Sequence, residues 1–207
     1  MSDRNNIFLV LASRSPRRRQ LLTEAGYRFE IHPADESVEE TVDQHLPPIE
    51  LVRESALRKA ADVVARIHAG SLKPFSKAAP TTKPIVLGCD TVAECAGHIL
   101  GKPVDRADAR RMLELLRGNR HRVISGLCLW PLDRKEPSVE VASTTLIMDP
   151  INSEQLDEYL AGDAWQNKAG AFGYQDRTGW IHVAEGSESN VVGLPMELLE
   201  RMLTNLD

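Results

Sequence analysis

Four arginines stand in or beside one predicted helical turn near the start of the chain. Residues 13–19 read SRSPRRR, and Ser15 followed by Pro16 marks the beginning of a helix. The N-terminus of a helix carries partial positive charge, so each cation there costs about 0.3–1 kcal/mol at an exposed site. A bound anion would reverse the sign of that effect. The segment therefore predicts phosphate binding; the alternative is surface pairing with the acidic stretch 35–40, and Arg19 fits that alternative best.

Asp90 is the carboxylate whose setting best suits catalysis. It follows the apolar run 85–88 (IVLG), so we expect it at the carboxyl end of a strand, where ligand crevices open in α/β sheets. There it could hold a metal or take a proton, or simply accept backbone N–H groups in the next turn. Lys102 lies nearby in a Gly-Lys-Pro turn. Lys59 lies at the polar edge of a predicted helix and could equally be solvated.

Residues 167–175 (NKAGAFGYQ) form a second candidate ligand segment. The two glycines, the lysine and the amide give a stretch too irregular for core packing, which is typical of a ligand-contacting loop. Gln175 can offer both a donor and an acceptor to a base edge, and Phe172 or Tyr174 could stack on the base. Burial in the core is the commoner role for such aromatic residues.

Composition and missing motifs exclude several classes of protein. Lys and Arg total 25 against 30 for Asp and Glu, a net charge of -5, which argues against coating nucleic acid through bulk charge. The three cysteines have no CxxC spacing, and Cys128 fits a small core residue. The six histidines show no HxxxH or HExxH spacing, so zinc chemistry has no support. Neither a Walker A sequence nor GxGxxG occurs.

The sequence contains no candidate membrane or secretion signal. No uninterrupted apolar run approaches the roughly 20 residues of a membrane helix, and the N-terminus turns polar too early for a signal peptide. We therefore expect a cytoplasmic protein that does not bind membranes.

Alternating strands and helices must position these residues. Strands are predicted at 7–12, 29–31, 85–94, 99–103, 121–130, 139–148 and 180–184. Helices are predicted at 16–25, 49–69, 106–117, 153–160 and from 196 onward, with Ser15, Asp105 and Ser153 as N-caps. The segment 71–84 reads as an extended surface loop with three prolines. This order predicts a mixed α/β sheet in two lobes with a cleft between them.

Several of these segments together resemble one family. LASRSPRRRQLL, ESALRKA, GCDTV, GKP, NKAGAFGYQ and SNVVGLPMELL, in this order, resemble the Maf family of nucleoside triphosphate pyrophosphatases. The resemblance spans nearly the whole chain and departs from the family mainly at 71–84 and 131–137. It implies a single domain over 1–207 with a Maf/Ham-type (ITPase-like) α/β fold, a mixed sheet flanked by helices. It also implies hydrolysis of a nucleoside triphosphate to the monophosphate and pyrophosphate, a divalent cation (Mg²⁺ or Mn²⁺), and a homodimer.

The resemblance also implies roles for individual residues. Asp90 matches the proton acceptor that activates water for attack on the α-phosphorus, and with Glu36, beside Asp35, it matches the acidic positions near the metal. The residues implied in substrate binding are Ser13, Arg17, Arg18, Lys59, Thr91, Lys102, Lys168 and Gln175.

The segment KAGAFGYQ, with Arg17 and Thr91, resembles the subgroup that hydrolyses dTTP and UTP. The subgroup that hydrolyses 7-methyl-GTP differs in this segment and is the second choice. Two readings from other classes remain open: a non-catalytic nucleotide-binding regulator of cell division, and a protein that binds single-stranded nucleic acid through its arginines.

Overall fold

The structure is a computed structural model that describes residues 7–73, 83–174 and 179–206 of the 207-residue chain. Its strands are β1 (Ile7–Leu11), β2 (Arg28–Ile31), β3 (Lys83–Cys95), β4 (His98–Leu100), β5 (Arg120–Pro131), β6 (Ser138–Met148) and β7 (Ile181–Glu185). Its helices are α1 (Pro16–Glu24), α2 (Ser37–Glu40), α3 (Pro48–His68), α4 (Arg106–Leu116), α5 (Ser153–Ala161), α6 (Glu188–Val192) and α7 (Met196–Thr204), with a 3₁₀ turn η2 (Ala169–Ala171).

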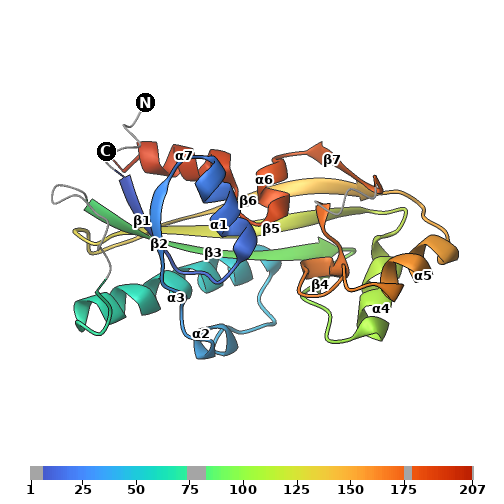
Figure 1. Cartoon of the computed structure of the whole chain (residues 1–207), viewed down its shortest axis with the longest axis horizontal. Coiled ribbons are helices and arrows are strands. Elements are labelled where there is room, and N and C mark those ends of the chain that lie inside the picture. Colours follow the sequence, from blue (N-terminus) through green and yellow to red (C-terminus); the bar gives the residue numbers. More distant parts are fainter. Residues whose placement is uncertain (1–6, 74–82, 175–178, 207) are drawn as a thin grey trace.

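Within the described residues, the strands form one mixed sheet in the order β2-β1-β3-β5-β6-β7, and β4 pairs with part of β3. β1 runs parallel to β2 and β3, whereas the pairs β3–β5, β5–β6 and β6–β7 are antiparallel. The long strands β3, β5 and β6 run along the long axis of the molecule (Figure 1). Side chains far apart in the sequence can therefore meet along them.

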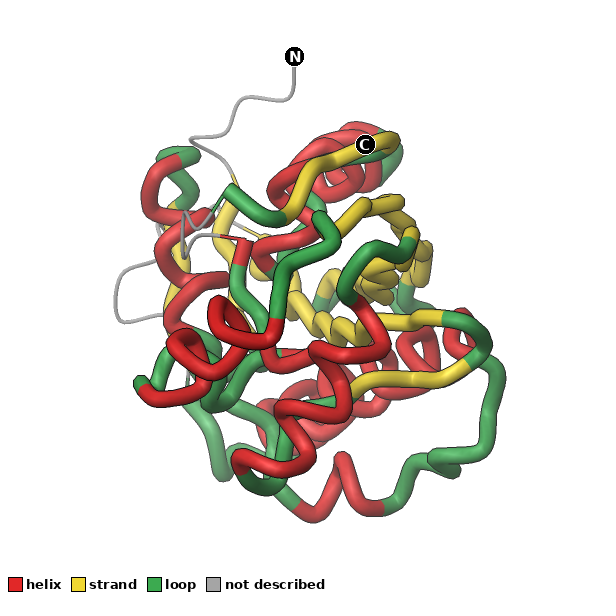
Figure 2. Tube along the Cα trace, turned by 90° about the vertical axis from the view of Figure 1, so that its right-hand side faces the viewer, coloured by secondary structure: helices red, strands yellow, loops and turns green. Residues whose placement is uncertain are grey.

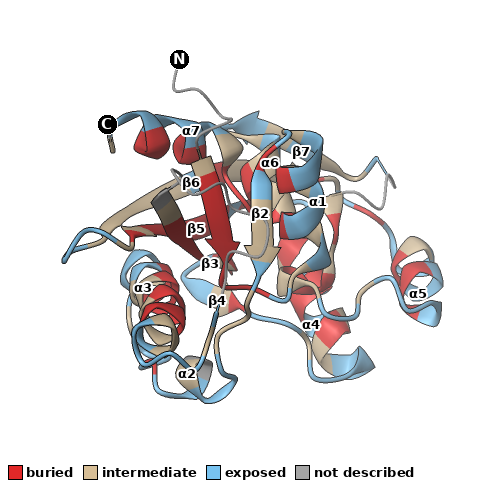
Figure 3. Ribbon diagram, turned by 60° about the vertical axis from the view of Figure 1, so that its left-hand side comes forward, coloured by how far each residue is buried: buried red, intermediate tan, exposed pale blue. Residues whose placement is uncertain are grey.

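Helices cover both faces of the sheet. α3 lies on one face, and α1, α6 and α7 lie on the other (Figure 1). Seen from the end that carries α4 and α5, the strands lie between helical layers (Figure 2). The buried residues of α3 lie on the side that faces the strands, and its outer side is exposed or half-buried (Figure 3).

Two glycines allow α3 to approach the sheet closely. A Cβ on Gly88 in β3 would lie 2.2 Å from the Ala56 carbonyl oxygen, and a Cβ on Gly126 in β5 would lie 2.1 Å from that of Val52. Both distances are too short for any side chain, so a hydrogen is required at these two positions. The close contact fixes the height of α3 above the strand that carries Asp90.

The hydrophobic core is divided along the sheet. One cluster joins α1 and α7 to the sheet, with Leu22 and Leu199 among its buried members. Two further clusters lie under α3. A separate cluster at the other end joins α4 and α5 to the sheet and contains Leu113 and Leu156. These separate cores match the predicted two-lobed mixed α/β architecture, although the lobes share the strands β3, β5 and β6.

One edge of β3 is interrupted between these cores. β1 pairs with β3 as far as Leu87, and β4 pairs with it from Ala93 onward. Among the described strands, none pairs with residues 88–92 on this edge, although β5 pairs with all of them on the other edge. The gap leaves the edge of β3 unpaired at Asp90 and Thr91, which both line a cavity.

The predicted elements are found with small differences in their bounds. Ser15 and Asp105 are N-caps as predicted, but the N-cap of α5 is Asn152 rather than Ser153, because Asn152 and Gln155 form a capping box. The short helices α2 and α6 were not predicted. No described helix is long and apolar enough to cross a membrane.

β3 and the segment before it differ from the prediction in their bounds. Asp90 does not end a strand as expected: β3 continues to Cys95, because β5 goes on pairing with it beyond the gap. The predicted loop 71–84 is shorter at its end, since Lys83 and Pro84 already belong to β3. Residues 74–82 of that loop lie outside the described part of the chain.

Candidate active site

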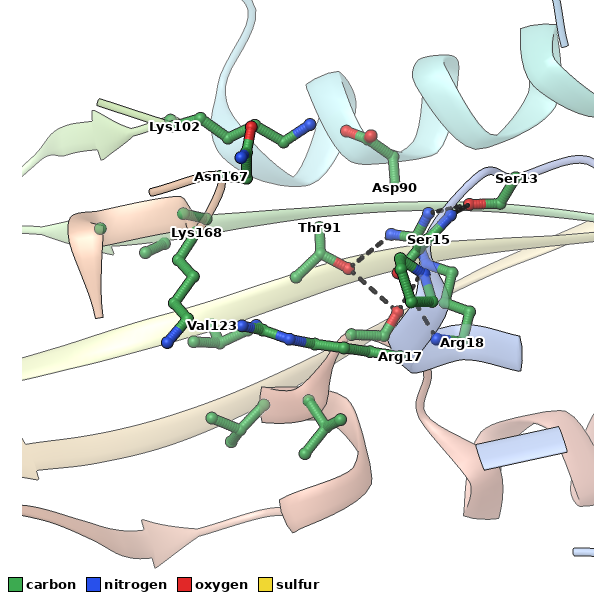
Figure 4. A pocket seen from close by; sticks show the side chains of 18 of the residues that line it. Ser13, Ser15, Arg17, Arg18, Asp90, Thr91, Lys102, Val123, Asn167 and Lys168 are labelled. Carbon is green, nitrogen blue, oxygen red and sulfur yellow. Dashed lines mark hydrogen bonds between the residues drawn. The ribbon is translucent and has the colours of Figure 1, made fainter. Parts of the chain in front are cut away.

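A cavity of about 850 Å³ lies at the gap in the sheet edge. This volume is within the usual range for small-molecule sites. The predicted site residues that line it are Ser13, Arg17, Arg18, Glu36, Lys59, Asp90, Thr91, Lys102 and Lys168. They come from α1, α3, β3 and four loops, and Figure 4 shows most of them around one space. Gln175, the remaining predicted member, lies outside the described residues.

The N-terminus of α1 forms one wall. Ser15 is its N-cap and accepts from the backbone N–H of Arg18, Pro16 occupies the first turn, and that turn holds no acidic residue. Arg17 and Arg18 therefore line the cavity at the positive end of a helix dipole, which is an arrangement that favours a bound anion. Arg14 pairs with the exposed carboxylate of Glu36, so the alternative of surface pairing holds for this arginine.

Arg18 is a buried cation with neutral partners. Its side chain donates from Nε to the Gly193 carbonyl at 2.8 Å and from its terminal nitrogens to Ser13 Oγ at 2.9 Å and Thr91 Oγ1 at 3.2 Å. The residue is 9% exposed, and no carboxylate among the described residues pairs with it. A buried charge of this kind is strongly stabilised by a counter-ion. The cavity offers the place for one.

Asp90 and Lys59 form another part of the wall. Lys59 Nζ lies 2.6 Å from Asp90 Oδ1, and the two side chains are 8% and 21% exposed. The solvated alternative for Lys59 is therefore wrong, because the close packing of α3 at Gly88 carries this lysine against β3. Within the described residues, Lys59 is the side chain that donates to the carboxylate, so Oδ2 remains for water or a cation.

Two loops bring further lysines to the cavity. The backbone N–H of Gly170 donates to the Gly101 carbonyl at 3.0 Å, and this bond joins the loop of Lys102 to the loop of Lys168. The Lys102 side chain points toward Asp90 (Figure 4). Arg17 runs in the direction of Lys168 and Val123 rather than toward Asp90 (Figure 4). Basic residues outnumber acidic ones in the lining, which makes the cavity electropositive in a protein of net charge -5.

The far end of the cavity is apolar. Its lining there includes Val123, Leu146, Phe172 and Ile181. Phe172 also packs against Tyr159 with ring centroids 5.3 Å apart, so it serves both the core and the cavity. This end suits the flat, partly apolar ring of a nucleobase.

His121 is a cavity residue that the sequence patterns did not single out. It is 4% exposed, and its Nδ1 has no partner within the described residues. Burial lowers the pKa of this ring, and a hydrogen bond with the Asn119 backbone offsets part of that effect. Its alternation with Val123 along β5, which places both on one face, is the sequence signal that would have found it.

A divalent cation fits the cavity only together with a ligand. No group of three or more His, Cys, Asp or Glu in the described part of the chain converges to hold a metal. Mg²⁺ is commonly held by one or two carboxylates with phosphate oxygens and water. The predicted ligands Asp90 and Glu36 both line the cavity, and the Glu36 carboxylate is exposed and paired with Arg14.

The fold and the cavity define a class: a mixed α/β protein with a cationic cavity that contains a carboxylate. The chain belongs to the Maf family, because the family model described as Maf-like protein matches residues 8–206.

Two relatives that are at least 40% identical to this chain agree with this assignment. The chain is 47% identical over 200 residues to a dTTP/UTP pyrophosphatase of Rhodopirellula baltica, covering 96% of this chain and 82% of the relative. It is 40% identical over 197 residues to a dTTP/UTP pyrophosphatase of Moorella thermoacetica, covering 94% and 93%. The solved structure of a HAM1 protein from Coxiella burnetii aligns with a TM-score of 0.47 at 15% identity, covering 96% and 99%.

Proposed function

We propose that this protein is a nucleoside triphosphate pyrophosphatase that converts dTTP and UTP to their monophosphates and pyrophosphate. The observation that carries the proposal is the buried Arg18 guanidinium, held by neutral oxygens in the cavity that also contains the Asp90–Lys59 pair. The names of the relatives, several of them dTTP/UTP pyrophosphatases, support the choice of substrate.

The two ends of the cavity suit the two ends of a nucleotide. The phosphates lie between the N-terminus of α1, with Ser13 and Arg18, and the lysines Lys59 and Lys102. The base lies in the apolar end, beside Val123 and Phe172. Thr91, Arg17 and Lys168 line the space between, and Gln175 stays a predicted reader of the base.

Asp90 acts as the general base. It takes a proton from a water molecule, whose oxygen forms a bond to the α-phosphorus while the bond to the bridging oxygen of the β-phosphate breaks. That oxygen leaves with its electron pair as part of pyrophosphate. Lys59 holds Oδ1 of Asp90 by a charge-assisted hydrogen bond, and Oδ2 accepts the proton of the water. The arginines and lysines stabilise the charge on the phosphates as the bond breaks.

A divalent cation completes the proposed site. Asp90 and Glu36 would hold Mg²⁺ or Mn²⁺ together with phosphate oxygens, and the cation would neutralise negative charge on the triphosphate. The single domain over 1–207, the homodimer, the cytoplasmic location and the lack of nucleic-acid binding stay predictions from the sequence.

The test is pyrophosphate release from a panel of nucleotides. Purified protein is assayed with dTTP, UTP, CTP, dATP, GTP and 7-methyl-GTP in the presence of Mg²⁺ or Mn²⁺. We expect kcat/KM to be highest for dTTP and UTP. A preference for 7-methyl-GTP would move the protein to the alternative subgroup, and binding without turnover of any nucleotide would favour the non-catalytic regulator.

The base is tested by Asp90→Asn. Loss of a general base lowers kcat by about 10²–10⁴-fold, and we expect nucleotide to bind still. Asp157→Asn is the matched control, because this carboxylate is 57% exposed on α5 and does not line the cavity. Unchanged turnover in Asp90→Asn would contradict the assignment of the base.

A further inference from the structure

The orientation of Arg18 depends on one backbone carbonyl. The oxygen of Gly193 accepts from Arg18 Nε at 2.8 Å, and Thr91 Oγ1 and Cys89 Sγ also lie 3.4 Å from it. Nε is the atom nearest the stem of the side chain, so this bond fixes the plane of the guanidinium. The terminal nitrogens then meet Ser13 and Thr91.

Gly193 follows directly after α6, a helix of only five residues. Its φ of 117° directs the chain out of the helix in a conformation that favours glycine. A helix this short has no stability of its own in water, so tertiary bonds must hold it in place. The position of the Gly193 carbonyl is therefore set by what anchors α6.

Asn190 anchors α6 to the sheet, whereas Ser187 and Ser189 bond to Glu197 of α7. Its side chain is fully buried, and Nδ2 donates to the Val123 carbonyl of β5 and to Thr144 Oγ1 of β6, both at 3.0 Å. Thr144 Oγ1 in turn accepts from the backbone N–H of Ser187 and donates to the Ser187 carbonyl, both at 3.1 Å. These bonds fasten the middle and the beginning of α6 to two strands.

The chemistry of Asn190 points to a geometric role. Its Oδ1 is buried with no partner in the described part of the chain, and an unpaired buried acceptor destabilises a fold. An apolar side chain would fill the space without that loss. The amide is therefore explained by what its Nδ2 holds in place rather than by burial.

We propose that Asn190 is a positioning residue for Arg18, acting through α6 and the Gly193 carbonyl. The proposal rests on the proposed function in assigning Arg18 to the phosphates of the substrate. Without the Asn190 amide, α6 can shift on the sheet, and the carbonyl no longer fixes the guanidinium. Misplacing a charged binding group by about 1 Å can lower activity by about 100-fold.

A double-mutant cycle with Arg18→Lys tests this coupling. Lysine keeps the charge but has no planar guanidinium group that the Gly193 carbonyl could orient. We expect Asn190→Ala to lower kcat/KM for dTTP by about 10–100-fold in the wild-type background and by less than about twofold in the Arg18→Lys background. Equal factors in both backgrounds would overturn the proposal, because independent effects add.

The same cycle is measured with inorganic tripolyphosphate by calorimetry. Binding of this anion requires neither catalysis nor a site for the nucleobase, so it tests the orientation of Arg18 even if no nucleotide is hydrolysed. Coupling in binding without turnover would support the positioning role and reject the proposed function. Turnover of dTTP without coupling in either measurement would reject the positioning role alone.

Further variants separate orientation from loss of fold. If Asn190→Ala does not fold, Thr144→Val takes its place, because it removes the hydroxyl that Asn190 binds. Thr144→Ser keeps that hydroxyl. We expect Thr144→Val to be coupled to Arg18→Lys, and Thr144→Ser to behave like the wild type. Met202→Ala is the matched control, because Met202 is buried in α7 and does not line the cavity. Coupling of Met202→Ala as strong as that of Asn190→Ala would also overturn the proposal.

Discussion

The two arginines at positions 17 and 18 show how neighbouring side chains of one type take different roles. Arg18 is buried and held by three neutral oxygens, whereas Arg17 is half-buried and lines the cavity in the direction of Lys168. Arg19 is exposed and does not line the cavity. The spacing along one helical turn, about 100° per residue, separates the three side chains.

This difference gives a prediction for single residues. Arg17→Ala removes a charged contact to substrate, which contributes about 1.5–3 kcal/mol and corresponds to about 10–150-fold in kcat/KM. Arg19→Ala, the matched control on the same helix, should change kcat/KM by less than about twofold. Steady-state kinetics with dTTP measures both. Equal losses would mean that the arginines act only as a diffuse positive field.

The element that places the catalytic pair is α3. Lys59 reaches Asp90 because α3 packs closely against β3 and β5, and that contact depends on Gly88 and Gly126. Ala56 and Ala60 are both fully buried on the same face of α3, and their small side chains allow the helix to lie close to the strands. The small residues on both sides of this contact therefore serve the site as well as the core.

Replacing Gly88 tests this role of α3. In Gly88→Ala the new Cβ meets the Ala56 carbonyl oxygen at 2.2 Å, so α3 must move away from the sheet. We expect the free energy of unfolding to fall by about 1–3 kcal/mol, with a loss of kcat as Lys59 shifts from Asp90. Urea denaturation and steady-state kinetics measure the two effects.

Gly162→Ala is the control for this substitution. Its Cβ would have Tyr159 O as its nearest atom, at 3.9 Å, and its φ is −92°. We expect near-normal stability and activity. If Gly88→Ala behaved like Gly162→Ala, close packing of α3 would not be what positions the pair.

At the scale of the whole molecule, the buried ring of His121 links stability to pH. Above its ordinary pKa of 6.5 the ring is neutral in both the folded and the unfolded chain, so it adds no pH dependence. Below 6.5 the unfolded chain takes up a proton that the folded chain does not, because burial lowers the folded pKa. The free energy of unfolding therefore falls as pH drops below 6.5, by up to about 1.4 kcal/mol per pH unit.

His121→Gln removes this titration while keeping a polar side chain. We expect the variant to lose less stability than the wild type between pH 7 and pH 5, as measured by urea denaturation at each pH. Glu94, Asp108 and Glu197 also have lowered pKa values, but their ordinary values are 4.5 or 3.8, so their effect begins at lower pH. Parallel curves for wild type and variant down to pH 5 would contradict the prediction.

The sequence by itself determined most of the elements and the family. Helix caps, hairpin turns and apolar periods depend on residues within a few positions of one another, so Ser15, Asp105 and the turn at Ala96 and Gly97 could be read directly. The ordered motifs, from the arginine-rich turn to the segment before α7, predicted the Maf family, and the match over residues 8–206 confirmed it.

Only the tertiary structure decided how the site is assembled. Lys59 and Asp90 are 31 positions apart, Arg18 and Thr91 are 73 apart, and Arg18 and Gly193 are 175 apart. Whether such residues meet depends on how closely α3 packs, where β1 ends beside β3 and what holds α6, and no local pattern records these. The sequence therefore predicted which charged residues belong to the site. The packing of helices on the sheet determined which of them are buried, paired and oriented.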